Sequence, residues 1–514
     1  MNLDLQLDDF VPSDDPCRVI RRIVWDLDTS SIEATYSDIG QRGYPPKLLL
    51  SVIFYGYSHG LRSGRKLSQA CKTDIRYIFL SQGYRPSKTT INDFRQAHFQ
   101  SFEDLFKQVV QKCIELGLVD LDQPVFGDGT KIRANANGKR SKTKDKYERW
   151  LGHLQNDIKE LSSQLEGSQE SKDDDSDDEL HQELGRKEYL TDKIQDRLER
   201  FDDQDDTQKV NLTDPDAHFM TGKKGYKDTN YNPQIVVSSN QVIIHNHVCT
   251  SSNDRHQLQP CVEGVKRNTG VYPKDSTWDC GYSSFDNEAY LETNKIEAYI
   301  PDQDFGKSHQ DKPFHKKHFV YHPQKDEYTC PQGKPLVFKR IKKDGSFRFR
   351  LYQGTQCQDC PCRIKCTTAK ARNLHREVRQ PLRDQMYERL KTTKGQQLCA
   401  MRKHRVEPVF GHLKHNLGYH QFLLRSLEKV QAEFNIMCIA YNLMKIAKFW
   451  SQKALDTPYR LLSSSLRRIS RRLNLIVNEL LASFYRCFIY IIYFNVIRWG
   501  LSLIHISEPT RRHL

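Results

Sequence analysis

The sequence predicts an α/β protein in which an all-helical block precedes a mixed β-sheet with helices on its faces. Two observations predict this class. Apolar residues recur at helical spacing through residues 44–120, whereas residues 121–301 read as strand, hairpin, helix, strand, helix and strand. Two segments, 147–207 and 302–400, break this order and are interpreted as insertions. The sheet domain would then be completed by residues 401–450.

The composition favours a soluble protein with a polyanionic partner. The 514 residues carry a formal net charge of +14, and 28% of them are charged while 37% are hydrophobic. This excess of positive charge indicates nucleic acid. The acidic stretch from Met1 to Pro16 has no apolar signal segment, so most of the 14 cysteines are expected to be reduced thiols.

The helical block follows an N-terminal segment, residues 1–43. Four helices are predicted, over residues 46–60, 67–83, 88–98 and 102–116, where Gly117 ends the last. The third helix buries Ile91 and Phe94 and is expected to expose Lys88, Thr89, Asn92, Arg95 and Gln96. Such side chains reach phosphates and base edges in a DNA groove. The alternative is an ordinary amphipathic helix of a small bundle.

The first strand of the sheet domain is expected to end at an acid. Val125 and Phe126 read as buried, and Asp128 lies between two glycines, which allow the close approach of a backbone or ligand. A basic run follows, at Lys139, Arg140, Lys142, Lys144 and Lys146. Residues 147–207 then show helical spacing on both sides of the acidic run 172–179, which predicts two antiparallel helices joined by a solvated acidic turn.

The rest of the sheet is predicted from short β-rich runs. A hairpin is expected from residues 231–237 and 242–250, and a helix over 254–267. Residues 276–282 are interpreted as a short strand that ends in a loop, and residues 295–300 as another strand. Asp279 lies at the end of the third of these strands. Three other acids, Asp254, Asp275 and Asp286, are interpreted as caps and turn residues, with Asp286 capping a helix that ends at Glu292.

The insertion at residues 302–400 is basic and contains cysteines. Two β-rich runs flank Lys343-Asp-Gly345, which predicts a hairpin. Four thiolates around this hairpin could form a structural Zn²⁺ site, at Cys330, Cys357, Cys360 and Cys366, with Cys362 left over. The pattern is incomplete, because only one side has a Cys-x-x-Cys pair.

A basic stretch, residues 402–419, contains one carboxylate, Glu407, directly before Pro408. Proline suits the first turn of a helix, so Glu407 is expected at a helix boundary, with Lys414 on the same face. An acid in these surroundings is suited to hold a divalent cation while basic neighbours hold phosphates, among them Arg402, Lys403 and, further on, Arg425. The alternative is a solvated basic helix. Helices are predicted over 379–403 and 432–450.

The C-terminal sequence differs in character. Residues 484–504 are long enough for a membrane helix, but two arginines and many β-branched and aromatic residues argue against one. Residues 502–511 look like translated sequencing-adapter sequence. Residues 476–514 are therefore interpreted as a non-native tail.

Three motifs surround Asp128, Asp279 and Glu407: Phe-Gly-Asp-Gly-Thr-Lys-Ile-Arg-Ala-Asn, Trp-Asp-Cys-Gly-Tyr and Arg-Val-Glu-Pro-Val-Phe-Gly-His-Leu-Lys. Together they resemble the bacterial DDE transposases of insertion sequences, in the subgroup with a helical N-terminal domain and an RNase H-like catalytic domain. The resemblance extends over residues 44–448. One departure is that Cys399-Ala400 occupies the region where relatives have a tyrosine.

The resemblance implies a fold, a reaction and partners. Residues 44–120 would bind DNA, and the mixed sheet would be RNase H-like. The catalytic residues and metal ligands would be Asp128, Asp279 and Glu407, and Lys414 would hold phosphate. Two Mg²⁺ ions, with Mn²⁺ as an alternative, suit three carboxylates and the hydrolysis of a phosphodiester. The partners would be double-stranded DNA, at element ends and target, and a second copy of the chain, without a membrane.

Two other functions stay open on these observations. The chain could be a DNA-binding protein that has lost catalysis, or a metal-dependent nuclease on the same fold. All three acids are present, which argues against decay of the site itself.

Overall fold

The structure is a computed structural model that describes residues 7–37, 43–168, 174–201, 208–222, 225, 227–305, 307, 312–344 and 347–456. The interpreted tail, residues 476–514, lies outside this part. The chain divides into two compact units, Met1–Ala447 and Lys448–Leu514. Asp128, Asp279 and Glu407 lie in the first unit.

The N-terminal part is helical, as predicted, and its helices begin earlier than expected. Residues 1–43 contain α1 (Leu7–Phe10), α2 (Pro16–Asp26) and α3 (Ser30–Glu33), ahead of α4 (Pro46–Ser58). Helix α2 packs against α4. Four residues of α2 are buried, Cys17, Ile20, Ile23 and Val24, so the segment shares the core of the helical block.

The predicted helix over residues 67–83 is two helices, α5 (Gly64–Thr73) and α6 (Ile75–Leu80). Asp74 separates them because its carboxylate accepts a hydrogen bond from the Arg76 N–H and caps α6. The next two helices confirm the prediction: α7 (Lys88–Ala97) begins after Ser87, and α8 (Ser101–Glu115) ends before Gly117. Gly117 has a φ of +74°, which favours glycine.

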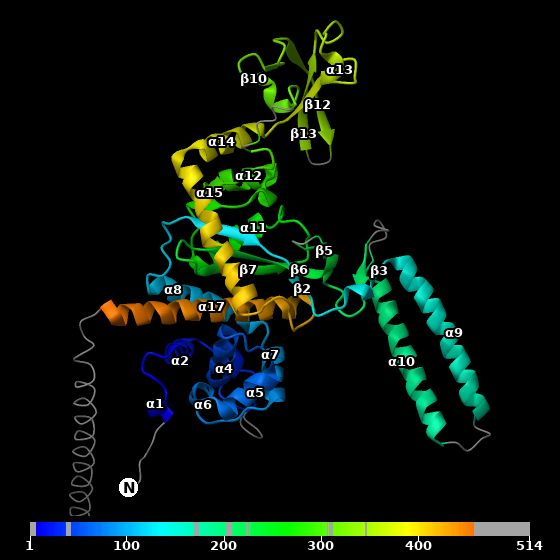
Figure 1. The fold of residues 1–514 in the computed structure, drawn as a ribbon, viewed down its shortest axis with the longest axis vertical. Coiled ribbons are helices and arrows are strands. Elements are labelled where there is room, and N and C mark those ends of the chain that lie inside the picture. Colours follow the sequence, from blue (N-terminus) through cyan, green and yellow to red (C-terminus); the bar gives the residue numbers. More distant parts are fainter. Residues whose placement is uncertain are drawn as a thin grey trace, which may run out of the picture. The chain divides into compact units, whose positions relative to one another are not determined.

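A seven-stranded mixed sheet confirms the α/β class (Figure 1). Its strands are β1 (Val125–Gly129), β2 (Ile132–Arg133), β5 (His218–Thr221), β6 (Lys227–Val237), β7 (Ile243–Cys249), β8 (Asp275–Thr277) and β9 (Glu297–Tyr299). The order is β7-β6-β1-β8-β9, and β6 is the reversed strand of these five. Strands β2 and β5 pair with the first half of β6.

Helices surround this sheet: α11 (Leu258–Thr269), α12 (Phe285–Thr293), α14 (Gln380–Lys391), α15 (Thr393–Arg405), α16 (Glu407–Gly411) and α17 (Leu427–Asp456). Gln431 and Asn442 of α17 bond the backbone of edge strand β7, at Val248 and Ile243. The predicted helix over 379–403 is two helices, and Thr392 caps the second. The predicted cap at Asp286 is wrong, because Ser284 caps α12 and Asp286 pairs with Arg379.

The two segments interpreted as insertions contain helices and strands that do not pair with the seven-stranded sheet. The helical hairpin is α9 (Lys144–Ser168) and α10 (Asp174–Leu198). Strand β3 (Ser141–Lys142) precedes it and pairs with β4 (Val210–Asn211), which follows it. The acidic run is already helical from Asp174, not a turn, while residues 169–173 lie outside the described chain. The second insertion is a five-stranded sheet with one short helix: β10 (Val320–His322), β11 (Glu327–Thr329), β12 (Pro335–Asp344), β13 (Phe347–Gly354), β14 (Asn373–Glu377) and α13 (Arg363–Cys366). Strands β12 and β13 are the predicted hairpin.

Candidate carboxylate site and nucleic-acid interface

Asp128 and Asp279 lie at the same end of two neighbouring parallel strands. Phe126 of β1 pairs with Thr277 of β8, and each aspartate lies two residues further along its own strand direction. Side chains that follow adjacent parallel strands meet at one edge of a sheet. The Asp279 carboxylate also accepts a hydrogen bond of 2.8 Å from the Gly281 N–H, which fixes the turn after β8.

The packing of Trp278 explains one glycine of the first motif. The indole is buried, and a side chain at Gly127 would come within 1.9 Å of it. Only a glycine therefore lets β1 lie against the ring, and the indole N–H donates to the Ser276 hydroxyl at 3.1 Å. This contact holds β1 and β8 together directly beside the two aspartates.

The two carboxylates share a poorly hydrated space with Arg402 of α15. Burial raises the pKa of Asp128 to about 6; Arg402 opposes this rise, and the nearby Asp279 and Asp254 add to it. Burial also raises the pKa of Asp279. Arg402 Nη1 lies 3.4 Å from Asp128 Oδ2, with the two side chains 14% and 16% exposed. Crowded acids of this kind bind a cation in preference to remaining charged alone.

Asp254 is a member of this cluster that sequence reasoning missed. Its Oδ1 accepts hydrogen bonds from the side-chain amides of Asn232, at 2.7 Å, and Gln234, at 2.8 Å. A side chain at Gly281 would lie 3.0 Å from Asp279 Oδ1 and 3.5 Å from Asp254 Oδ2. The interpretation of Asp254 as a turn residue was incomplete. The direction of the strands could have indicated Asp254. Because β7 runs parallel to β1, the residues that follow β7 lie at the same end of the sheet as Asp128.

Glu407 is the first residue of α16 and is exposed. Within the described part of the chain its side chain forms no hydrogen bond or ion pair, and none joins it to either aspartate. The residues before and after Glu407 do contact the end of β1. Arg402 contacts Asp128, and Lys414 Nζ donates to Thr130 Oγ1 at 2.6 Å and to the Lys131 carbonyl at 2.7 Å. The segment that carries Glu407 therefore lies along the end of β1.

The spacing of ligand atoms differs between the candidate metal sites. Among the described residues, the one group of three or more potential ligand atoms within 4.8 Å of one another is His245, His247 and Cys261. The acids and the four predicted zinc cysteines are more widely spaced. Those cysteines line a common pocket of about 30 Å³. Burial is the main cause that raises the pKa of Cys366, and the other three cysteines of the cluster raise it further. Zinc binding at this cluster stays a prediction.

Two family models match the chain. The family described as "Transposase DDE domain" matches residues 329–447, and the family described as "Transposase domain (DUF772)" matches residues 5–97. The search of curated proteins gave no match. Both matched families are transposase families, and together they support an insertion-sequence DDE transposase. The first match contains Glu407 and lies beyond Asp128 and Asp279 in the chain.

A transposase DDE domain implies a DNA partner and a dependence on divalent metal. In the described residues, none of the helices is long and apolar enough to cross a membrane. DNA would bind where exposed positive charge gathers on the surface. Two such surfaces carry most of the relevant side chains.

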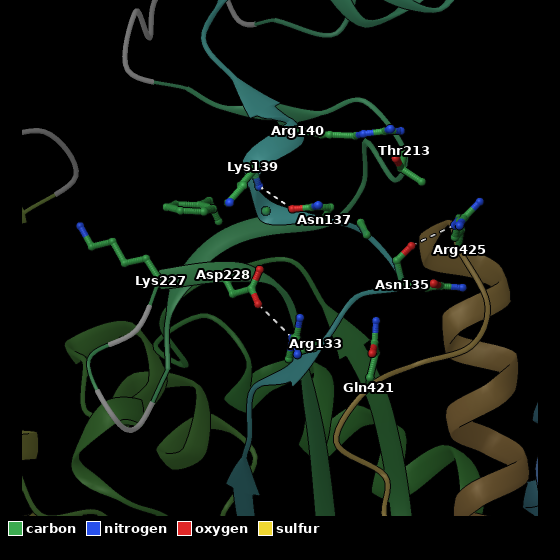
Figure 2. Close-up of a pocket in the computed structure, with 13 residues that line it drawn as sticks. Arg133, Asn135, Asn137, Lys139, Arg140, Thr213, Lys227, Asp228, Gln421 and Arg425 are labelled. Atoms are coloured by element: carbon green, nitrogen blue, oxygen red, sulfur yellow. Dashed lines mark hydrogen bonds and ion pairs between the residues drawn. The ribbon is translucent and has the colours of Figure 1, made fainter.

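The first surface is an open basic pocket of about 840 Å³ that begins with β2, directly downstream of Asp128 (Figure 2). Five of its lining side chains are cationic: Arg133, Lys139, Arg140, Lys227 and Arg425. Asp228 is the one acid in the lining and pairs with Arg133 at 2.9 Å. The sequence predicts that Arg425 contacts DNA, and Lys139 and Arg140 belong to the basic run noted there; Arg133 and Lys227 were not singled out. This excess of positive charge suits a phosphate backbone.

The second surface of the transposase is a groove of about 670 Å³ between α5 and α7. The predicted residues Lys88, Thr89 and Asn92 line it, together with Arg65 and Lys66 of α5, which were not predicted. The expectation that Arg95 is exposed is wrong. Its side chain is buried because it donates hydrogen bonds to the Tyr57 hydroxyl, the Arg62 carbonyl and Asn92 Oδ1.

Proposed function

We propose that this transposase binds the ends of its insertion sequence and catalyses DNA cleavage and strand transfer by a DDE mechanism. Asp128, Asp279 and Glu407 are the proposed catalytic residues. The observation that carries the proposal is the pairing of Asp128 and Asp279 at one end of parallel strands, in a buried space that Arg402 enters. The strand order β7-β6-β1-β8-β9, with β6 reversed, supports an RNase H-like assignment of the sheet.

The donor set of this site fits a hard divalent cation. Asp128, Asp279 and the neighbouring Asp254 offer oxygen atoms alone, and Glu407 adds a carboxylate without a partner among the described residues. Mg²⁺ prefers such oxygen ligands, and Mn²⁺ accepts them. When bound, a pair of these ions supplies an activated water and compensates charge on the leaving oxygen of a phosphodiester. Asp128, Asp279 and Glu407 would hold them.

Basic side chains of the chain hold and orient the DNA in this proposal. The Arg402 guanidinium neutralises Asp128 and is suited to bind two oxygens of one phosphate. Lys403 and Lys414 extend the positive charge along the segment of Glu407. The basic pocket, with Arg425, binds the backbone beyond β2, and Lys88, Thr89 and Asn92 of α7 bind the duplex. A second copy of the chain joins when both element ends are bound.

The test compares cleavage with binding on DNA that carries the element's own ends, in Mg²⁺. Asp128→Asn, Asp279→Asn and Glu407→Gln are each expected to abolish strand cleavage and to leave end binding unchanged in a gel-shift assay. Cleavage retained by one variant removes that residue from the site. Binding without cleavage by the unmodified chain supports the catalytically decayed protein, and cleavage without end joining supports the plain nuclease.

A further inference from the structure

A second group of metal-binding side chains lies between β7 and α11. His245 and His247 are two residues apart in β7, so their side chains lie on the same face of the strand. Helix α11 packs on this face and places Cys261 beside them. His245 Nε2 lies 3.0 Å from His247 Nδ1, and Cys261 Sγ lies 3.9 Å from the same nitrogen. This is the group whose ligand atoms all lie within 4.8 Å of one another.

We propose that His245, His247 and Cys261 form a site for a borderline-soft divalent ion, with Zn²⁺ as the expected occupant. Two imidazoles and one thiolate are ligands that Zn²⁺ prefers and that Mg²⁺ does not. The donor set therefore separates this site from the carboxylates at Asp128 and Asp279. Cys249 ends the same face of β7, but its thiol donates to the Asn232 carbonyl at 3.2 Å, so the three residues above are the proposed ligands.

The hydrogen bonds around His247 leave the correct nitrogen unprotonated for a metal. His247 Nε2 lies 3.0 Å from Gln257 Oε1, so this nitrogen carries the proton and donates it. The other nitrogen, Nδ1, then has an unprotonated lone pair, which accepts a hydrogen bond from His245 Nε2 at 3.0 Å; a bound ion would take the place of that proton between the two rings. A partner of this kind, which fixes the tautomer of a ligating histidine, is common at metal sites in proteins.

The helix is also shaped to admit the ring of His245. A side chain at Gly264 would come within 2.1 Å of His245 Cε1 and Nδ1, so only a glycine allows α11 to approach this closely. Gly264 follows Cys261 by one helical turn, which brings the glycine and the thiol onto the same face of α11. His245 and Cys261 are buried, at 2% and 0% exposed. His247 is half-buried, so two of the three ligands lie in the interior and the third lies near its edge.

The proposed ion would fix the loop that carries Asp254. This loop lies between His247 and Cys261, and Gln257 bonds both His247 and the Asp254 carbonyl. A metal held from both sides of the loop would limit the movement of Asp254 relative to Asp128. This consequence for catalysis rests on the proposed function, whereas the metal site itself does not.

The experiment measures zinc in the full chain with the other candidate cluster removed. Cys357→Ser with Cys360→Ser serves as the background, because these changes eliminate the predicted cysteine site. The background protein is expected to keep about one equivalent of zinc after dialysis, by elemental analysis, since one site takes one ion. Replacement by Co²⁺ is expected to give the absorption of a thiolate bound to cobalt.

Adding Cys261→Ala or, separately, His247→Gln to the background is expected to remove both the zinc and the cobalt–thiolate absorption. Cys113→Ala is the matched control, because this thiol is equally buried, at 0% exposed, in α8. A background protein without zinc, or zinc retained after either substitution, overturns the proposal and leaves a hydrogen-bonded chain of His245, His247 and Gln257. Cleavage of DNA is not part of this readout, so failure of the proposed function would not affect it.

Discussion

The carboxylate site and the basic pocket differ in how their side chains are held. Asp128 and Arg402 are largely buried and in contact, and Asp254 accepts two hydrogen bonds from β6. In the basic pocket, by contrast, Arg133 is 56% exposed although it pairs with Asp228, and Lys139 and Arg140 are exposed as well. Chemistry at a phosphodiester needs fixed geometry, whereas attraction to a phosphate backbone needs mainly charge. Substitutions should therefore change reaction rate in the first region and salt-dependent affinity in the second.

The largest effect is expected for Asp254→Asn. The substitution keeps an oxygen that can accept from Asn232 and Gln234, but it replaces the other carboxylate oxygen by an NH₂ group, which cannot bind a cation, and removes a negative charge beside Asp128. We expect DNA cleavage to fall by about 10²-fold, the upper range for residues that orient metal ligands, with end binding unchanged. Asp286→Asn on α12 is the control, since that carboxylate pairs with Arg379 outside the cluster. Equal cleavage by the two variants would remove Asp254 from the site.

A stability effect should distinguish the buried and exposed cations of α7. Arg95→Ala leaves the Tyr57 hydroxyl, the Arg62 carbonyl and Asn92 without their donor, so we expect unfolding free energy to fall by about 2 kcal/mol. Lys88→Ala, on the same helix but exposed, should change it by less than about 0.5 kcal/mol. Urea denaturation followed by circular dichroism measures both. A stable Arg95→Ala protein with weakened DNA binding would restore Arg95 as a DNA contact.

Much of the sheet could be predicted, because its signals are local. Alternating apolar runs marked β6 and β7, and the glycines around Asp128 marked the end of β1. The helix breaks at Asp74 and Thr392 were missed because a capping side chain ended each helix within an otherwise continuous pattern. Residues 1–43 were set apart for a related reason, since their apolar residues acquire partners only when α2 packs against α4.

The candidate site was predicted less completely, because its members meet only in three dimensions. Asp128, Asp279 and Glu407 were recognised from motifs, while Asp254 has no motif of its own and becomes visible through strand direction. The two cysteine-containing groups show the same contrast. The four cysteines in the insertion have suggestive spacing along the chain but wider spacing in space, whereas His245, His247 and Cys261 are close in space without a sequence pattern.

Metal binding at the carboxylate site should weaken at acidic pH. Asp128 must lose its proton to bind a cation, and burial raises its pKa to about 6 from 3.8. Below pH 6 we therefore expect affinity for Mn²⁺ to fall by about tenfold per pH unit, measured by calorimetry on the metal-binding wild type.

The sign for stability without metal is opposite to that of a salt-bridged acid. The folded state binds the proton of Asp128 more tightly than the unfolded state, so metal-free protein should lose stability as pH rises from about 4 to 6. Asp128→Asn should lack this slope. A wild-type slope identical to that of the variant would contradict the burial of a titrating carboxyl at this position.

The smallest effect is expected in the basic pocket, for Arg140→Ala. Arg140 is exposed, so its loss should leave folding and the cleavage rate of bound DNA unchanged. We expect the slope of log affinity against log salt concentration to decrease in magnitude by about one, with weaker binding to all DNA sequences alike, as for loss of a single phosphate contact. Lys159→Ala, an exposed lysine on α9, is the matched control for net charge. If both variants weaken binding equally, the pocket is no more than part of a generally positive surface. If Arg140→Ala alone changes the slope, the backbone of the DNA crosses this pocket. The exposed pocket then contributes salt-dependent affinity, whereas the buried carboxylate site contributes reaction rate.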